Sequence, residues 1–244
     1  MKAWLDTLIF GVYPYICLAV FLLGSLLRFD RDQYTWKSDS SQLLRSGQLR
    51  WGSNLFHVGI LFLFFGHTVG MLTPHFVYEP FISAGAKQLV AMISGGAFGV
   101  LGLLGLTLLL HRRLFDVRIR STSKTSDIVL LFLLWLQFAL GIATVPLSAQ
   151  HLDGSMMMVL AEWAQRIVTF RGGAAELMAE VGPVFRAHMF LGMTIFLIFP
   201  FTRLVHVWSG FGTLAYVMRP YQVVRARRLN VPAGHNMPQG DASA

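Results

Sequence analysis

The chain has 244 residues, of which 55% are hydrophobic and 13% charged, and its mean hydropathy is +0.57. A soluble domain carries about a quarter charged residues, so this composition excludes an ordinary soluble protein and indicates an integral membrane protein. The formal net charge of +8 lies in short basic segments between apolar runs, which is typical of membrane topology signals and not of a nucleic-acid-binding face.

Five apolar segments are long enough to cross a bilayer, which takes about 20 residues of helix. The expected spans are about Trp4–Leu27, Gly52–Leu72, Gln88–Leu110, Ile128–Leu147 and Val184–Trp208. Pro14 should kink the first span without breaking it, the fourth span should break near Pro146, and Pro200 lies inside the fifth span, where it would introduce a kink. The first span lacks a small-residue cleavage site, so we do not expect a cleaved signal peptide. The fold class is therefore an all-α integral membrane protein, a bundle of five transmembrane helices.

The basic residues are distributed unequally between the two sides of this bundle. Fifteen Lys and Arg lie between spans one and two, between spans three and four, and from the end of span five onward, against five elsewhere. Because cytoplasmic segments carry the excess of Lys and Arg, we expect the N-terminus outside and the C-terminus in the cytoplasm. We divide the chain into a membrane domain, residues 1–218, and a cytoplasmic tail, residues 219–244, whose last part has the composition of a disordered segment.

The connection between spans four and five contains a segment with helical periodicity, Ser155–Phe170. Its polar residues share one face, and its apolar residues share the other: Met156, Leu160, Trp163 and Ile167. We interpret this segment as a helix in the outer membrane interface; the alternative is a cover helix packed on the neighbouring loops. The sequence leaves both alternatives open.

Glycines recur at helical spacing in span two, where they share one face of the helix: Gly52, Gly59, Gly66 and Gly70. Such spacing is typical of helices that pack closely together. The alternative is that glycine leaves room for the edge of a macrocycle.

Two of the spans carry two histidines each, although an ionisable group inside a membrane is costly and therefore indicates function. His57 and His67 are about 15 Å apart along span two, whereas His188 and His206 would be about 27 Å apart on a straight helix. Because the two spans are antiparallel, we expect His57 to pair with His206 on the cytoplasmic side and His67 with His188 on the outer side. Helix tilt or a kink at Pro200 would have to absorb the unequal spacing.

Four imidazoles at two depths match the ligands of two b haems, because a bis-histidine haem needs only two protein ligands. The single cysteine, Cys17, excludes a disulfide, a cysteine-based zinc or iron–sulfur site, and covalent haem attachment through C-x-x-C-H. Zinc would keep half of its coordination tetrahedron empty. A proton-relay transporter would be expected to carry Asp or Glu inside its spans, and the expected span interiors have none. Full axial coordination leaves electron transfer as the expected chemistry.

The sequence resembles the gamma, cytochrome b, subunits of membrane-bound respiratory nitrate reductases over about residues 8–228. The segments that carry the resemblance are Tyr13–Tyr15, Gln33–Trp36, Ser53–His57, Gly66–His67, Gly70–His75, Ser148–Gly154, Phe185–His188, Gly192–Thr194, Phe199–His206 and Tyr221–Arg225. These motifs are highly specific together.

The resemblance implies a subunit of a bacterial inner-membrane complex that oxidises quinol at the outer face during anaerobic respiration. It implies two b haems held by the four histidines, and electrons passed to an iron–sulfur beta subunit and then to a molybdenum-containing alpha subunit that reduces nitrate. The implied partners are these two subunits, membrane quinol and lipid, with no nucleic acid. Two alternatives remain: the b subunit of a formate dehydrogenase or hydrogenase, and an assembly anchor without haem.

The cytoplasmic side carries a cluster of arginines. Guanidinium groups bind carboxylates bidentately, so some of these residues should bind the propionates of the inner haem. Arg203 is the first choice, because it lies three residues before His206 and should share its helix face, and Arg112 belongs to the same cluster. The other arginines, with the segment Tyr221–Arg228, are expected to anchor the soluble subunits.

The outer side carries the expected quinol site. Lys87 is the only Lys or Arg between spans two and three, and its three donors could hold a quinol oxygen. Gly66, next to His67, would let the quinol ring approach. His75 and His151 should lie at the outer surface, either as exposed loop residues or as groups that take part in handling quinol.

Overall fold

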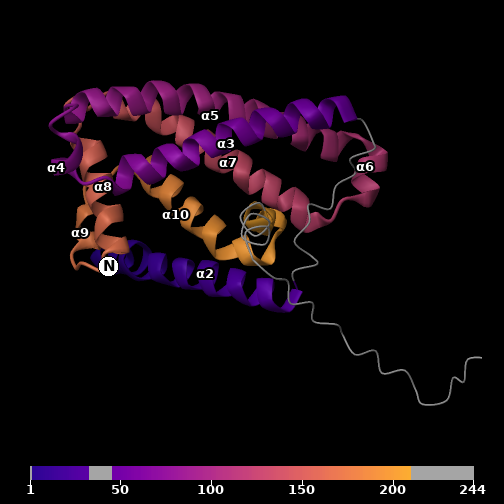
Figure 1. The fold of residues 1–244 in the computed structure, drawn as a ribbon, viewed down its shortest axis with the longest axis horizontal. Helices are drawn as coiled ribbons and strands as arrows, with labels where there is room; N and C mark the ends of the chain where they lie inside the picture. The colour runs from indigo at the N-terminus through magenta and orange to yellow at the C-terminus, as the bar shows by residue number, and fades with distance from the viewer. Residues whose placement is uncertain (1, 33–45, 210–244) are drawn as a thin grey trace, which may run out of the picture. The chain divides into compact units, whose positions relative to one another are not determined.

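The computed structural model describes residues 2–32 and 46–209, which contain helices and turns but no strand. The chain divides into two compact units, Met1–Val207 and Trp208–Ala244, and the first unit holds the helix bundle (Figure 1). The predicted boundary at residue 218, the cytoplasmic tail and the segment Tyr221–Arg228 lie outside the described residues.

Five described helices are long and apolar enough to cross a membrane: Ala3–Arg31, Ser46–Leu72, Ala84–Phe115, Thr125–Ser148 and Pro183–Phe201. They correspond to the five predicted spans, so the all-α architecture with five candidate membrane spans is confirmed. The fifth ends at Phe201 and not at Trp208, and the break predicted near Pro146 is wrong, because α7 continues through that residue to Ser148. The second, third and fourth of them are α3 (Ser46–Leu72), α5 (Ala84–Phe115) and α7 (Thr125–Ser148).

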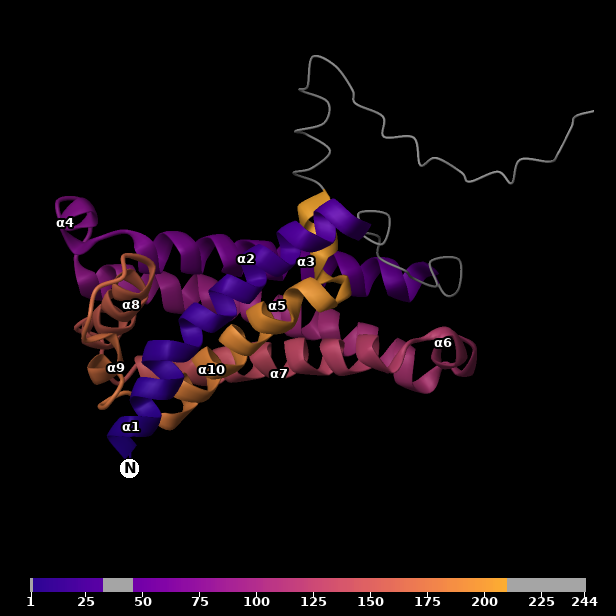
Figure 2. The same cartoon turned by 90° about the horizontal axis from the view of Figure 1, so that it is seen from below.

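Short helices gather at the two ends of the bundle (Figures 1 and 2). One end holds α4 (His75–Tyr78), α8 (Ser155–Val168) and α9 (Ala174–Leu177), and is called the α8 end here. The opposite end, the α6 end, holds α6 (Val117–Thr122). Each end is therefore marked by its own connecting segments.

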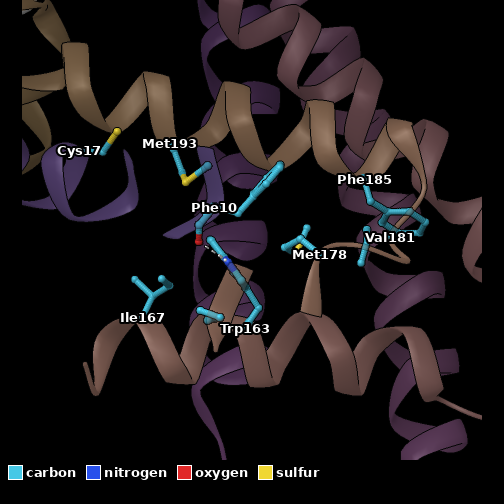
Figure 3. Packing of buried hydrophobic residues seen from close by; sticks show 10 residues of the cluster. Phe10, Cys17, Trp163, Ile167, Met178, Val181, Phe185 and Met193 are labelled. Carbon is cyan, nitrogen blue, oxygen red and sulfur yellow. Dashed lines mark hydrogen bonds between the residues drawn. The ribbon is translucent and has the colours of Figure 1, made fainter. Parts of the chain in front are cut away.

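The first span is irregular because of Pro14. It runs from α1 (Lys2–Thr7) through a π-helical turn, η1 (Leu8–Val12), into α2 (Tyr13–Asp32). Proline has no N–H, so Pro14 cannot donate to the carbonyl of Phe10 four residues earlier. The indole Nε1 of Trp163 donates to that carbonyl instead, at 3.0 Å (Figure 3). A side chain of α8 thus replaces a backbone hydrogen bond that the first span lacks.

Helix α8 packs on the bundle as a cover helix. Trp163 and Ile167 are buried in a cluster that also includes Phe10, Met178 and Phe185 (Figure 3). On its polar side, Gln165 Nε2 donates to the carbonyls of Met71, at 2.9 Å, and Thr73, at 3.4 Å. These carbonyls end α3 and have no intrahelical partner, so α8 closes the end of that helix.

The glycines of α3 fall into two groups. A Cβ at Gly59 would lie 2.7 Å from the Cα of Gly102 on α5, and a Cβ at Gly52 would lie 3.2 Å from the carbonyl oxygen of Gly105. Close packing of α3 on α5 therefore requires these two glycines, as the spacing predicted. A Cβ at Gly66 or at Gly70 would meet no described atom within 4 Å.

The fifth predicted span, about Val184–Trp208 with a kink at Pro200, is interrupted more strongly than a kink would require. Helix α10 (Pro183–Ile198) ends in a 3-10 turn, η3 (Phe199–Phe201), and Thr202 is extended, with φ −115° and ψ 178°. A second 3-10 turn, η4 (Arg203–Val205), follows. The cause is Pro200, which cannot donate to the carbonyl of Phe196 and so ends the regular ladder.

Candidate functional site

The four span histidines form two pairs, one toward each end of the bundle. The ring centroids of His57 and His206 are 6.1 Å apart, with the ring planes at 72°. The ring centroids of His67 and His188 are 6.3 Å apart, with the planes at 43°. These are the antiparallel pairs expected from the sequence. The break after α10 removes the spacing conflict, because His206 does not lie on a straight continuation of that helix.

Each of the four imidazoles places its Nδ1 within hydrogen-bond distance of a backbone carbonyl. The distances are 2.7 Å from His57 to Ser53, 2.7 Å from His67 to Leu63, 3.2 Å from His188 to Gln137, and 2.7 Å from His206 to Arg203. A carbonyl oxygen only accepts, so Nδ1 must carry the hydrogen and Nε2 keeps its lone pair. All four rings are therefore in the tautomer that ligates a metal through Nε2.

The spacing of each pair fits two imidazoles that bind one iron from opposite sides. A metal–imidazole bond is about 2 Å long, so rings ligated in line through Nε2 have centroids about 6 Å apart. Within the described residues, no group of three or more His, Cys, Asp or Glu side chains is placed to hold a metal ion. A group that brings its own equatorial ligands and needs two protein ligands, as a haem does, suits this donor set.

The turn that carries His206 is held by an arginine from the first span. Arg28 Nη1 on α2 donates to the carbonyls of Pro200, at 2.7 Å, and Thr202, at 2.9 Å. The hydroxyl of Thr202 accepts from the amide of Leu204 at 3.3 Å and caps η4. Gly24 on α2 lets Pro200 approach, since a Cβ there would lie 2.9 Å from the proline ring. The break is thus a built feature that the first span supports.

The predicted propionate ligand Arg203 lies in an ion cluster at the α6 end. Its Nε is 3.7 Å from Asp127, and Arg113 Nη1 is 3.5 Å from the other carboxylate oxygen of Asp127. Arg112, also predicted to bind cofactor, is buried on α5 with 2% of its surface exposed. Arg203 begins the 3-10 turn η4, and His206 follows that turn directly, with its Nδ1 2.7 Å from the carbonyl of Arg203.

The predicted quinol-binding lysine lies at the α8 end, near the start of α5. Lys87 Nζ lies 3.5 Å from the centroid of the Tyr78 ring, within the range of a cation–π contact. This Nζ is buried and makes no hydrogen bond to the described residues. Burial raises the pKa of Tyr78, and the nearby carboxylate of Glu79 adds to this effect. Lys87 therefore offers unused donors beside an aromatic ring.

Both outer histidines of the sequence analysis also lie at the α8 end. His75 Nδ1 is 3.1 Å from a carboxylate oxygen of Glu79, and its ring centroid is 5.1 Å from that of Tyr78. His151 is exposed, and its backbone carbonyl accepts from Gln88 Nε2 at 2.6 Å. His75 thus lies beside the Lys87 neighbourhood, while the loop of His151 is tied to the start of α5.

Three residues that matter for the histidines were missed in the sequence analysis. Asp127 binds Arg203, and Arg28 supports the turn of His206. Gly141 on α7 borders the His188 ring, where a Cβ would lie 3.0 Å from Cε1. Asp127 and Arg28 are charged residues near apolar runs, a signal that could have marked them. Gly141 has no such signal in the sequence.

Comparison with known proteins gives consistent matches. The sequence model of the family described as "Nitrate reductase gamma subunit" matches residues 6–227. The chain is 56% identical to the respiratory nitrate reductase 2 gamma chain of Escherichia coli (strain K12) over 229 residues, which cover 93% of this chain and 100% of that one. It is 39% identical to the nitrate reductase gamma chain of Bacillus subtilis (strain 168) over 221 residues, 90% of this chain and 98% of that one.

Proposed function

Because the chain belongs to the nitrate reductase gamma subunit family, we propose that it oxidises membrane quinol and feeds the electrons to the nitrate-reducing subunits. It is a multi-pass protein of the bacterial cytoplasmic membrane and a subunit of a respiratory nitrate reductase complex. The observation that carries the proposal is the two histidine pairs, in which each ring has its Nδ1 at a backbone carbonyl, so that the lone pair lies on Nε2.

The two pairs would hold two b haems, one between His57 and His206 and one between His67 and His188. When bound, each haem supplies reversible one-electron transfer at its iron. The chain contributes fixed ligand tautomers and orientations, because a hydrogen bond to Nδ1 fixes the ring and raises its basicity as a ligand.

The distribution of Lys and Arg supports an orientation with the α8 end outside and the α6 end in the cytoplasm. The pair His67–His188 then lies on the outer side, where α4 and Lys87 are. The pair His57–His206 lies on the cytoplasmic side, near the arginine cluster. Electrons that enter at the α8 end would leave at the α6 end, toward the iron–sulfur beta and molybdenum-containing alpha subunits.

Lys87 would bind a quinol oxygen with the donors that make no hydrogen bond to the described residues. Gly66 supports this site, since the space beside it is free of described atoms within 4 Å of a Cβ. Quinol oxidation releases two protons for every two electrons, so the site needs an exit to water. His75 and Glu79, with 41% and 63% of their side chains exposed, lie next to Tyr78 on that route.

At the α6 end, Arg203 and Arg112 would serve the propionates of the inner haem. A propionate would add a second carboxylate to the cluster in which Asp127 already lies between Arg113 and Arg203. The arginines beyond residue 209 would anchor the soluble subunits. Deletion of Tyr221–Arg228 should release the partner subunits and leave both haems in the membrane; normal retention of the partners contradicts the anchoring role.

The haem proposal is tested by counting haem per protein in four single variants of the purified complex. Replacing His57 or His206 by alanine should remove one haem, and replacing His67 or His188 should remove the other. A chain without b-type bands in its reduced-minus-oxidised spectrum would be a haem-free anchor. If the His57 and His188 variants lose the same haem, the pairing is wrong.

The quinol proposal is tested with Lys87→Ala. Loss of one hydrogen bond from a charged donor costs about 1.5 kcal/mol or more, so quinol-dependent haem reduction should slow about tenfold. Both haems should remain, and nitrate reduction with an artificial donor to the soluble subunits should be unchanged. Lys124→Ala, which removes a lysine before α7 at the opposite end, is the control. Parental haem reduction in Lys87→Ala would make Lys87 a membrane-end lysine only.

A further inference from the structure

His188 differs from the other three histidines in what holds its ring. His57 and His67 each bond to the carbonyl four residues earlier in α3, and His206 bonds to the carbonyl three residues earlier in its own turn. His188 lies on α10, but its Nδ1 bonds to the carbonyl of Gln137 on α7, at 3.2 Å. Only this imidazole, among the four, depends on a neighbouring helix for its tautomer.

Gly141 is the residue that makes this contact possible. In a helix the side chain of residue i+4 leans over the turn that carries carbonyl i, so a side chain at 141 would cover the carbonyl of Gln137. A Cβ at Gly141 would lie 3.0 Å from Cε1, 3.6 Å from Nδ1 and 3.7 Å from Nε2 of His188. Because Gly141 has no side chain, the imidazole of His188 can lie directly against α7.

The backbone at this point is held from within α7. The hydroxyl of Thr144 donates to the carbonyl of Gly141 at 2.6 Å. Phe138, one residue after Gln137, is buried against Gly102 of α5, where a Cβ would lie 2.1 Å from its ring. The carbonyl that binds His188 therefore belongs to a stretch of α7 that is fixed on both sides.

We propose that the Gln137 carbonyl and Gly141, the His188 seat, are positioning elements for the haem ligand His188. The seat fixes the Nδ1–H tautomer and the rotation of the ring, so α7 controls one of the two haem sites although it carries no ligand. This inference rests on the proposed function, since it concerns how an axial ligand is oriented. It leads to a site-specific expectation: a disturbed seat changes the haem between His67 and His188, and not the haem between His57 and His206.

The test is Gly141→Ala in the intact complex, with Gly99→Ala as the matched control. Gly99 lies on α5 against the same helix, and a Cβ there would meet Ile142 of α7 at 3.2 Å. Both variants crowd α7 to a similar degree, but only Gly141→Ala crowds the imidazole. The low-spin ferric EPR signal and the midpoint potential are measured for each haem, and the His variants assign the signals.

We expect Gly141→Ala to shift the signal and the potential of the His67–His188 haem, or to remove that haem alone. Gly99→Ala should leave both haems as in the parent. Two unchanged haems in Gly141→Ala, or equal changes in the two variants, would overturn the inference. If neither variant nor parent contained b haem, the proposed function would fail first, and this outcome is distinguishable from the others.

The unsubstituted complex gives a second measurement that does not depend on folding of a variant. Pulsed EPR after exchange of Nδ1–H for deuterium reports the hydrogen bond of each axial imidazole. The two ligands of the His67–His188 haem should differ, because their Nδ1 distances are 2.7 and 3.2 Å. The two ligands of the other haem, both at 2.7 Å, should be alike. Equivalent ligands in both haems would contradict the His188 seat.

Discussion

Helix α3 and residues 183–206, called the α10 segment, each carry two of the four imidazoles. They hold these imidazoles by different means. α3 is one unbroken helix of 27 residues, and each of its histidines bonds to a carbonyl of the same helix. The α10 segment is interrupted after Ile198; His188 depends on α7, and the turn of His206 depends on Arg28 from α2. The ligands of α3 therefore take their support from their own helix, whereas each ligand of the α10 segment involves a contact from another helix.

The two kinds of support predict different effects of a substitution on the two haem sites. A change that moves α3 as a rigid body should alter both haem sites together, because α3 carries one ligand of each pair. A change in a support of the α10 segment should alter one haem site only. Four substitutions test this distinction. The measurements are haem per protein, the spectra of the haems and the thermal stability of the complex.

The largest effect is expected for Arg28→Ala. It removes two hydrogen bonds from a charged donor, to the carbonyls of Pro200 and Thr202, at a cost of about 3 kcal/mol. The haem between His57 and His206 should be lost or reduced, and the other haem retained. Arg31→Ala is the control, because Arg31 and Arg28 on α2 line one apolar groove together with Pro200. Equal loss of both haems would break the distinction drawn above.

Gly59→Ala should come next. Its Cβ would lie 2.7 to 2.8 Å from backbone atoms of Gly102 and Phe98, and such overpacking costs about 2 kcal/mol. Because the helices must separate, both haem contents should fall in parallel with thermal stability. Gly47→Ala, on the same helix with no atom within 4 Å of the added Cβ, is the control. Loss confined to one haem would show that α3 does not act as one body.

Asp127→Asn should have a smaller effect, because its contacts to Arg113 and Arg203 are 3.5 and 3.7 Å long and the amide oxygen of asparagine can still accept from an arginine. The loosened Arg203 carries the carbonyl that binds His206. The EPR signal of the His57–His206 haem should therefore broaden while the other signal is unchanged. Glu162→Gln breaks an ion pair of α8 at the opposite end and should change neither signal. A change in the His67–His188 signal would contradict this expectation.

The smallest effect is expected for Ser53→Ala. Its hydroxyl lies 3.2 Å from His57 Nδ1, but the carbonyl of the same residue lies at 2.7 Å and remains. The loss should be below about 0.5 kcal/mol, with parental haem content and spectra. A loss of haem comparable to that in Arg28→Ala would mean that the carbonyls of α3 do not suffice to hold its ligands.

The spans and the histidine pairs could be predicted from the sequence because they follow from additive signals. Length and hydropathy place the helices, and the antiparallel course of two spans joins His57 with His206 and His67 with His188. The break after Ile198 could not be predicted, since Pro200 is compatible with a kink as well as with an end. Arg28, which lies 172 residues before Pro200 in the sequence, binds the carbonyl of Pro200 and so supports the end of the helix.

The roles of individual glycines were equally beyond the sequence. Gly59 and Gly66 lie on the same face of α3, yet one meets the backbone of α5 and the other meets no described atom within 4 Å of a Cβ. Gly141 belongs to no repeated spacing, and its importance comes from a ring on another helix. A glycine acts through whatever approaches it, and that neighbour is set by tertiary structure.

The hydrogen bond from Trp163 to Phe10 has a consequence for biogenesis. The carbonyl of Phe10 enters the membrane with the first span, and the amide that would normally reach it is missing at Pro14. Its partner indole lies 153 residues further along the chain, and so is synthesised only after the first four spans have been synthesised. The first helix to be inserted therefore gains this hydrogen bond only late in synthesis. A chain truncated before α8 would leave the carbonyl of Phe10 exposed to lipid.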